Sequence, residues 1–213
     1  MKNIDTISHV TGKSVYLDDI PTISGTLHAA VVGSAIAHGK ILKVDTTEAL
    51  RLDGVVKVIT CTDIPGENQI GGIVEDETLL AEGEVHYQGQ PIAVVIAKTE
   101  RDAHKAAKMV RIDYQELEPV TDPRIAKEKG LLLIPPRTFS MGNPNEVWSQ
   151  CKYIVEDSIE LGGQEHLYIE TQGAYAYPVE GGYIKVHSST QGPTAVQKTV
   201  ARVLGLPMNL IEV

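Results

Sequence analysis

The sequence predicts an α+β protein, and three observations support this fold class. Two stretches have the pattern of a strand, a helix and a second strand, at residues 27–60 and 91–114. A third stretch, residues 174–204, alternates like a β-hairpin and then changes to helical spacing. Because amphipathic helices bury their apolar faces against sheets, we expect a mixed sheet with helices packed on it.

The first unit is predicted from its alternation and from one helix start. Residues 27–32 and 55–60 are predicted strands, and the second of them follows Gly54. Between them, Asp45-Thr46-Thr47-Glu48 has the side chains of a helix N-cap with an acidic residue close behind it. A short helix should therefore connect the two strands.

The second unit repeats this order. Residues 91–97 form a β-rich apolar run, and residues 110–114 return as a strand. The helix between them, residues 99–109, has Thr99 as its N-cap and places Asp102 at its third helical position. The loop between the two units, residues 62–84, is rich in glycine and in acidic residues, which we interpret as solvated.

A change in composition marks the predicted domain boundary. Five of the eleven prolines lie within residues 118–150. Stretches of this kind typically connect domains. We therefore expect a first domain at residues 1–120, a linker at residues 121–150 and the beginning of a second domain at residues 151–213.

The second domain is predicted to begin and end with strands. Residues 153–161 place apolar side chains on one face and polar side chains on the other. Residues 209–213 read as the start of another strand. Because the chain stops there with no closing element for this domain, we expect it to be a piece of something longer.

One stretch of the second domain combines a strand, a sharp corner and a helix. Residues 183–188 should pair with residues 174–178 as a hairpin, and a helix follows from Pro193. The corner, Ser189-Thr190-Gln191, lies at the carboxyl end of the strand and beside the partial positive charge of a helix N-terminus. Such corners bind anionic and oxygen-rich ligands, although the same three residues also suit a simple cap and turn.

Composition limits the classes of partner. The chain has 213 residues, of which 42% are hydrophobic and 22% charged, and a formal net charge of -9. An acidic chain without a basic stripe repels nucleic acids and anionic membranes, so we expect neither as a partner. The longest apolar runs, such as residues 92–97, are too short to span a bilayer, and we expect a cytoplasmic protein. Cys61 and Cys151 lie 90 positions apart, which gives neither a metal motif nor a disulfide framework.

Three local patterns have simpler interpretations than a site. Residues 33–41 resemble a phosphate-binding loop, but the spacing is one residue too long and Ile41 replaces the Ser or Thr that would hold magnesium. Glu165 and His166 could form an acid/base pair, yet neighbours on a strand point to opposite faces, so we favour a supporting structural role. No two histidines have metal-ligand spacing in the sequence. The histidines are His9, His28, His38, His86, His104, His166 and His187.

Several short motifs occur together in an order typical of one enzyme family, and they cover nearly the whole chain. They are residues 11–20, Ser34-x-x-Ala37-His38-Gly39-x-Ile41, residues 54–58 with 63–66, Val85-x-Tyr87-x-Gly89-Gln90-Pro91-Ile92, residues 103–117, Gly163-Gln164-Glu165-His166-x-Tyr168-x-Glu170 and Ser189-Thr190-Gln191. In these motifs the sequence resembles the amino-terminal part of the molybdenum-binding subunit of the xanthine dehydrogenase and aldehyde oxidase family.

The resemblance implies a hammerhead domain followed by the incomplete start of a molybdopterin-binding domain. It also implies a molybdenum-dependent oxidoreductase that hydroxylates a purine such as xanthine or hypoxanthine with water as the oxygen donor; aldehydes and other heterocycles are the alternatives. The cofactor would be molybdenum-molybdopterin, with iron-sulfur clusters and FAD on companion domains or subunits. The implied partners are the rest of the molybdenum subunit, these companions and a small-molecule substrate.

Within the resemblance, Gln191 is the residue assigned to the cofactor. The glutamine of the family's Ser-Thr-Gln segment reaches an oxygen ligand of molybdenum, and this position is Gln191. The catalytic glutamate, the substrate-positioning arginine and a glycine-rich loop belong to parts of the family sequence beyond Val213. We therefore expect no catalytic residue and no direct metal ligand in this chain, and by itself it should bind no cofactor and be a catalytically silent structural or interaction module.

Overall fold

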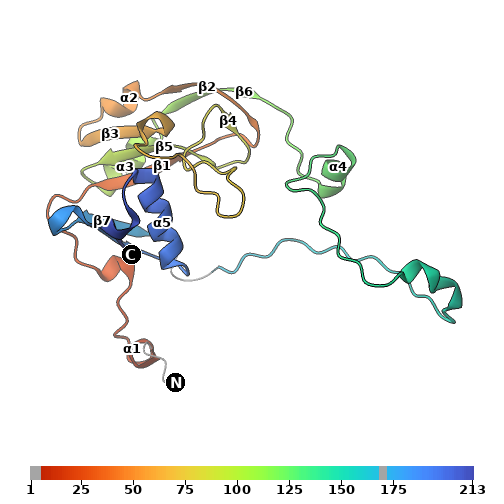
Figure 1. The fold of residues 1–213 in the computed structure, drawn as a ribbon. Helices are drawn as coiled ribbons and strands as arrows, with labels where there is room; N and C mark the ends of the chain where they lie inside the picture. Colours follow the sequence, from red (N-terminus) through yellow and green to blue (C-terminus); the bar gives the residue numbers. More distant parts are fainter. Residues whose placement is uncertain (1–5, 168–171) are drawn as a thin grey trace. The chain divides into compact units, whose positions relative to one another are not determined.

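The computed structural model describes residues 6–167 and 172–213. The chain divides into two units, residues 1–119 with residues 170–213, and residues 120–169 (Figure 1). The helices among the described residues are α1 (Thr6–Val10), α2 (Thr47–Leu50), α3 (Glu100–Ala107), α4 (Pro123–Glu128) and α5 (Pro193–Leu204). The strands are β1 (His28–Gly33), β2 (Gly39–Asp45), β3 (Val55–Thr60), β4 (Glu84–Val85), β5 (Pro91–Ala97), β6 (Arg111–Glu116), β7 (Ala174–Pro178), β8 (Ile184–Ser188) and β9 (Ile211–Glu212). Single turns of 3-10 helix are η1 (Leu17–Asp19), η2 (Cys61–Asp63), η3 (Pro144–Glu146), η4 (Trp148–Gln150), η5 (Glu180–Gly182) and η6 (Met208–Leu210).

β5 is the central strand of the first sheet, whose order is β1-β5-β3. Both neighbours are antiparallel to it, with Val95 opposite Ala30 on β1 and opposite Val58 on β3. Four of the seven residues of β5 are buried. A strand hydrogen-bonded on both edges and covered by other elements must be apolar along most of its length, which explains the uninterrupted apolar run of β5.

α3 covers this sheet through its smallest side chains. Ala103 and Ala106 are fully buried, which lets the helix lie close against β1 and β5 (Figure 1). The predicted cap is confirmed, because the Asp102 backbone N–H donates to Thr99 Oγ1 at 3.1 Å. The helix therefore begins where its local sequence predicts.

The second sheet, of order β4-β2-β6, is also antiparallel. The expectation that the first two units form one mixed sheet is therefore wrong. β2, which is not among the predicted strands, folds back to pair with β6 instead of joining β1. The two sheets share a core in which Val85 of β4 and Ile92 of β5 are buried against Ile41, Val44 and Ile112.

The predicted hairpin near the end of the chain forms the third sheet, of order β7-β8-β9. β7 pairs antiparallel with β8, while β9 pairs parallel to it. α5 provides the crossover that a parallel pair needs, and its Ala201 is buried with Val186 and Ile211. The helix ends at Gly205, whose φ of 64° is the left-handed conformation that glycine adopts most easily.

Residues 153–161, predicted to be a strand, have no regular structure, so this prediction is wrong. Their apolar side chains are exposed, Val155 by 92% and Leu161 by 80%. Alternation alone does not make a strand, because the backbone also needs a neighbouring strand to bond with. Within the described residues this stretch pairs with none.

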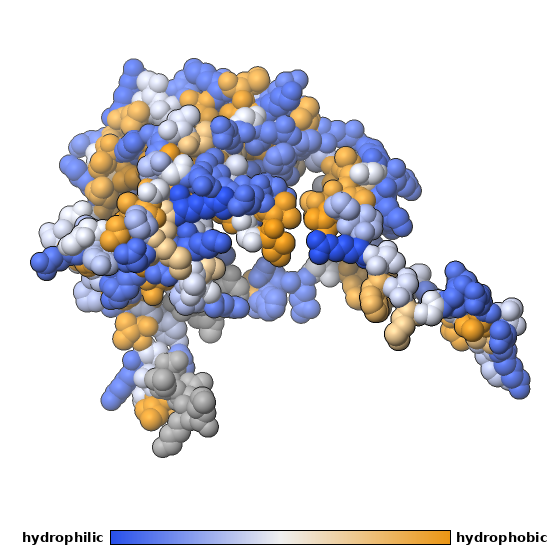
Figure 2. Space-filling model, in the orientation of Figure 1, coloured by the Kyte–Doolittle hydropathy of each residue, from blue (hydrophilic) through white to orange (hydrophobic). Residues whose placement is uncertain are grey.

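In the second unit, residues 120–169, the described part up to residue 167 contains one short helix and two 3-10 turns. Asp122 caps α4, since its Oδ1 accepts a hydrogen bond from the Arg124 backbone N–H at 2.8 Å. Many apolar side chains of this unit are exposed, including Leu133 and Phe139. Figure 2 shows apolar residues, in orange, among the polar ones on the surface of the protein. Of the helices in the described part of the chain, none combines the length and the apolar character that crossing a membrane requires.

Candidate functional site

The corner between β8 and α5 is formed by residues 189–192, and two hydrogen bonds hold its backbone. The Ser189 backbone N–H donates to the Gly173 carbonyl at 3.1 Å, and the Gly192 backbone N–H donates to Thr190 Oγ1 at 3.0 Å. Pro193 then occupies the first position of α5. This is the corner that the sequence predicts, and none of these bonds uses the Gln191 side chain.

Gln191 is exposed at this corner, and its amide hydrogen-bonds to no side chain or backbone group within the described residues. A glutamine amide carries two N–H donors and an oxygen acceptor and is neutral. The first N–H groups of α5 have no partner inside the helix and carry its partial positive charge. The corner can therefore accept an anionic or oxygen-rich group without adding negative charge to it.

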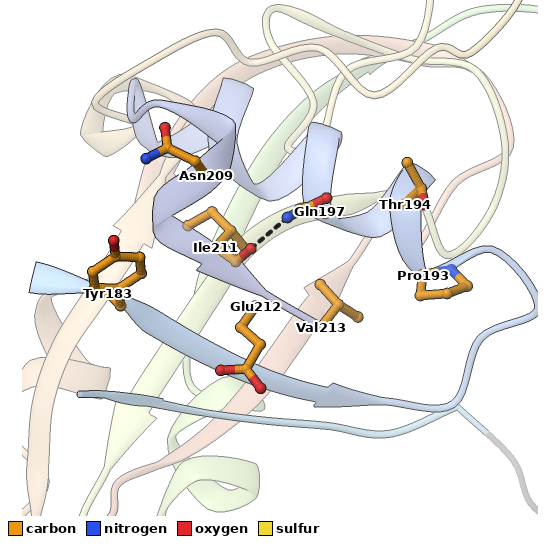
Figure 3. Close-up of a pocket in the computed structure, with 8 residues that line it drawn as sticks. All are labelled: Tyr183, Pro193, Thr194, Gln197, Asn209, Ile211, Glu212 and Val213. Carbon is orange, nitrogen blue, oxygen red and sulfur yellow. Dashed lines mark hydrogen bonds between the residues drawn. The ribbon is translucent and has the colours of Figure 1, made fainter. Parts of the chain in front are cut away.

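An open hollow of about 510 Å³ lies between α5 and the ends of β8 and β9 (Figure 3). Gln197 crosses it, with Nε2 donating to the Ile211 carbonyl at 2.6 Å. Lys185 Nζ pairs with Glu212 at 2.8 Å, which raises the pKa of Lys185. The residues that line the hollow are Tyr183, Pro193, Thr194, Gln197, Asn209, Ile211, Glu212 and Val213. Gln191 is not one of them.

Glu165 and His166 lie in the second unit and are exposed. The His166 backbone N–H donates to Glu165 Oε1 at 2.9 Å, so the carboxylate contacts the backbone of its neighbour. Neither residue is on a strand. Their supporting role stays a prediction, and the Tyr168 and Glu170 positions of the same motif lie outside the described residues.

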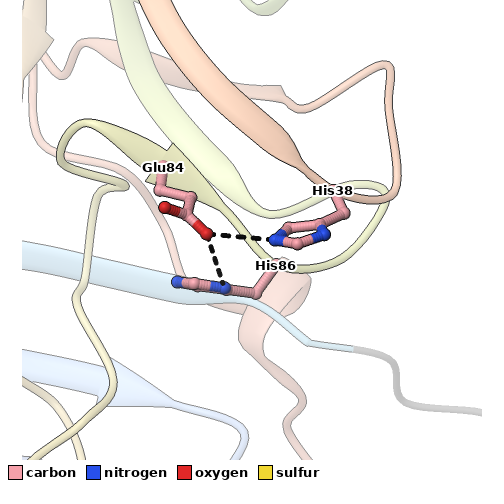
Figure 4. Close-up of side chains that lie close together, drawn as sticks. All are labelled: His38, Glu84 and His86. Atoms are coloured by element: carbon pink, nitrogen blue, oxygen red, sulfur yellow. Dashed lines mark hydrogen bonds and ion pairs between the residues drawn. The ribbon is translucent and has the colours of Figure 1, made fainter. Parts of the chain in front are cut away.

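A second cluster, His38, Glu84 and His86, is not predicted from the sequence (Figure 4). His38 directly precedes β2, while Glu84 lies in β4 and His86 directly follows it. β2 and β4 pair antiparallel with Gly39 opposite Val85, which places the two histidines across from each other. His38 Nε2 lies 3.0 Å from Glu84 Oε1, and His86 Nδ1 lies 3.8 Å from the same oxygen.

His38 is held at both ring nitrogens. Its Nδ1 donates to the Glu118 carbonyl oxygen at 3.1 Å, and Nε2 faces the Glu84 carboxylate. Both hydrogen bonds raise the pKa of His38, and the bond to the Glu118 carbonyl has the larger effect. The only hint in the sequence is Glu84-Val85-His86, where residues two apart on a strand share one face.

The structure also supports rejection of the phosphate-loop resemblance. Residues 33–41 end one strand and begin another, β2, rather than leading into a helix. A phosphate loop requires the N–H groups at the start of a helix. Here the Ser34 hydroxyl instead donates to the Ile36 carbonyl at 2.7 Å, which closes a simple turn.

Comparison with known proteins identifies the class. Residues 11–118 match the family described as "Aldehyde oxidase and xanthine dehydrogenase, a/b hammerhead domain", and residues 127–213 match "Molybdopterin cofactor-binding domain". Both predicted regions therefore match, in the order that the sequence predicts. The chain belongs to the xanthine dehydrogenase and aldehyde oxidase family, which confirms the predicted family and fold class.

Individual relatives agree with this assignment. "Aldehyde oxidase 2" of Cavia porcellus is 40% identical over 207 residues, 96% of this chain and 15% of that protein. "Xanthine dehydrogenase" of Drosophila pseudoobscura pseudoobscura is 36% identical over 208 residues, 96% of this chain and 16% of that protein. The solved structure of the aldehyde oxidoreductase from Desulfovibrio gigas gives a TM-score of 0.85 at 29% identity, covering 98% of this chain and 25% of that one. The chain thus spans only 15–16% of the length of these two curated relatives.

Proposed function

We propose that the chain is part of a molybdenum hydroxylase that acts on a purine such as xanthine or hypoxanthine. The order of the two matched regions, hammerhead first and molybdopterin-binding second, carries the molybdenum hydroxylase part of this proposal, and the xanthine dehydrogenases among the relatives support a purine substrate. In the overall reaction a substrate C–H and one water become C–OH, and two electrons and two protons leave. Because the relatives include aldehyde oxidases as well as xanthine dehydrogenases, an aldehyde or another heterocycle is the alternative substrate.

The proposed cofactor is molybdenum-molybdopterin, which supplies the oxidation of the substrate carbon and takes up its electrons. The corner before α5 suits an anionic, oxygen-rich group, because the exposed Gln191 lies two residues before Pro193, the first residue of the helix. We assign Gln191 as the donor of a hydrogen bond to an anionic oxygen of the cofactor. This residue would position and stabilise that oxygen without itself exchanging a proton.

The proposed enzyme needs partners beyond this chain. The rest of the molybdenum subunit would complete the cofactor site, and iron-sulfur clusters and FAD on companion domains or subunits would carry the electrons onward. Exposed apolar side chains such as Leu133 and Phe139 support contacts with neighbouring parts, since soluble proteins rarely leave so much apolar surface uncovered. We also propose a cytoplasmic location, because Cys61 and Cys151 are free thiols, the form that a reducing compartment preserves.

Turnover by the full-length enzyme tests the proposal. Xanthine, hypoxanthine, and one aliphatic and one aromatic aldehyde are assayed with an artificial electron acceptor in water enriched in oxygen-18. We expect a purine to be hydroxylated with the heavy oxygen in the product. If only aldehydes are turned over, the proposed substrate becomes an aldehyde instead of a purine. A purified enzyme that contains no molybdenum would refute the whole assignment.

For the 213 residues by themselves we propose a different role, that of a catalytically silent module that binds neighbouring parts. The exposed apolar side chains of residues 131–161 favour this role, with Leu133 exposed by 96% and Ile159 by 82%. Metal and pterin analysis of the isolated chain, together with light scattering for its oligomeric state, provides the test. Stoichiometric molybdenum with pterin in the isolated chain would contradict a silent module.

A further inference from the structure

We propose that His38, Glu84 and His86 form a zinc site, independent of the proposed molybdenum chemistry. One ligand atom from each residue lies within 4.8 Å of the other two (Figure 4). In a tetrahedral zinc site with metal–ligand bonds of about 2.0–2.1 Å, the ligand atoms lie about 3.3 Å apart. The two measured separations, 3.0 Å from His38 Nε2 to Glu84 Oε1 and 3.8 Å from His86 Nδ1 to the same oxygen, lie on either side of that value.

The hydrogen bond at the far side of His38 prepares this ring for a metal. Its Nδ1 donates to the Glu118 carbonyl at 3.1 Å, so in the neutral ring the proton is on Nδ1 and the lone pair is on Nε2. Metal-binding histidines almost always donate their other N–H in this way, which fixes the tautomer and the ring orientation. The lone pair of Nε2 then points to the side where Glu84 and His86 lie.

The backbones that carry the other two ligands are also fixed. β4 is paired with β2, and its Val85 is fully buried. The His86 backbone N–H donates to Oε1 of Gln90 at 2.7 Å, and Gln90 is itself buried. Because the ligands start close to their binding positions, little conformational freedom is lost when a metal binds.

The donor set favours zinc over magnesium or calcium. Two imidazole nitrogens and one carboxylate oxygen suit borderline metals such as zinc, whereas magnesium and calcium prefer oxygen ligands alone. The His86 side chain is 65% exposed, so one side of the site is open to water, which would supply the fourth ligand. A metal here joins the start of β2 to β4 and should stabilise the folded state in proportion to its occupancy.

The experiment measures zinc in the full-length protein. Wild-type protein is dialysed against micromolar zinc, with excess magnesium present to occupy surface carboxylates that bind metals weakly. The zinc content per chain is then measured by mass spectrometry, separately from molybdenum and iron. We expect His86→Ala to contain about one zinc fewer per chain than wild type and to bind zinc at least about tenfold more weakly, since even the outer partners of metal ligands contribute about 10–100-fold. Thermal unfolding should show a zinc-dependent rise in Tm for wild type that His86→Ala lacks.

A matched control distinguishes this site from adventitious binding. His104 on α3 is equally exposed, at 64%, and lies 3.9 Å from a single carboxylate, that of Glu100. His104→Ala should keep the wild-type zinc content and Tm response, while His38→Ala should lose both. Equal zinc content and affinity in wild type and His86→Ala, or an equal loss in His104→Ala, would overturn the proposal. Because molybdenum content is measured in the same samples, this outcome is separate from the fate of the proposed function.

Discussion

Replacing Gln191 with alanine tests the assignment of the corner before α5. The side chain is exposed and bonds to no group among the described residues, so its loss should change the free energy of unfolding by less than about 0.5 kcal/mol. The turn should survive, because the bonds from Gly192 to Thr190 and from Ser189 to Gly173 do not involve this amide. Any effect on activity can therefore be read as chemistry rather than as misfolding.

The expected effect is a fall in kcat. If the amide supplies one preorganised hydrogen bond to an oxygen of the cofactor, its removal should slow turnover by about tenfold or more, since single donors of this kind contribute up to about 10²–10³-fold. A tenfold loss corresponds to about 1.4 kcal/mol in the activation free energy. The KM for the organic substrate should change little, because the amide is assigned to the cofactor. Gln191→Glu keeps the size of the side chain but introduces a negative charge, so it should be slower than Gln191→Ala.

Steady-state kinetics of the full-length enzyme, expressed per bound molybdenum, provide the measurement. Gln88→Ala is the matched control, because Gln88 is an exposed glutamine on the turn between β4 and β5 and should leave kcat unchanged. Wild-type turnover by Gln191→Ala at full molybdenum occupancy would show that Gln191 is only a turn residue, and the proposed contact would be abandoned.

Three further predictions concern stability. Ile92→Ala should destabilise the chain by about 2–5 kcal/mol, because Ile92 is 1% exposed, while the same change at the fully exposed Ile73 should cost under about 0.5 kcal/mol in urea unfolding. Thr99→Ala should cost about 1 kcal/mol by removing the α3 cap, and an unchanged urea midpoint would contradict this. The hydrogen bond from the Lys57 side chain lowers the pKa of Asp63 in the folded protein. The ionised Asp63 therefore stabilises the folded state fully above the unfolded-state pKa of about 4, and this stabilisation is lost as the pH falls through the lower folded-state pKa. Asp63→Asn should therefore differ from wild type at pH 7 and converge with it in acid, and a pH-independent difference would argue against the pair.

Local chemistry explains why part of the fold can be predicted. α3 begins after Thr99, whose Oγ1 accepts a hydrogen bond from the Asp102 backbone N–H, and α5 runs from Pro193 to the residue before Gly205. The apolar run of β5 has the bounds of the strand that it forms. These signals act between residues a few positions apart and need no partner from elsewhere in the chain.

Strands whose pairing depends on residues far away in the sequence cannot be predicted from such local signals. β2 pairs with β6 through an irregularity between Ile41 and Lys43, so its apolar residues do not alternate strictly. β4 is only two residues long, which is too short for an alternating pattern to predict a strand. Residues 153–161 show the opposite error, because they alternate well but have no strand beside them among the described residues.

The two candidate sites differ for the same physical reason. The corner at Gln191 is formed by neighbours in sequence, so the pattern of strand, turn and helix is enough to locate it. His38 and Glu84 are 46 positions apart and meet only because Gly39 lies opposite Val85 in the antiparallel ladder. A side chain at Gly39 would lie 2.7 Å from the Gln115 carbonyl oxygen, so glycine is what lets β2 approach β6 beside this cluster. A slip of one residue in the β4 pairing would turn Glu84 and His86 to the other face and separate them from His38. The zinc site is therefore a property of strand register, which spacing along the sequence does not encode.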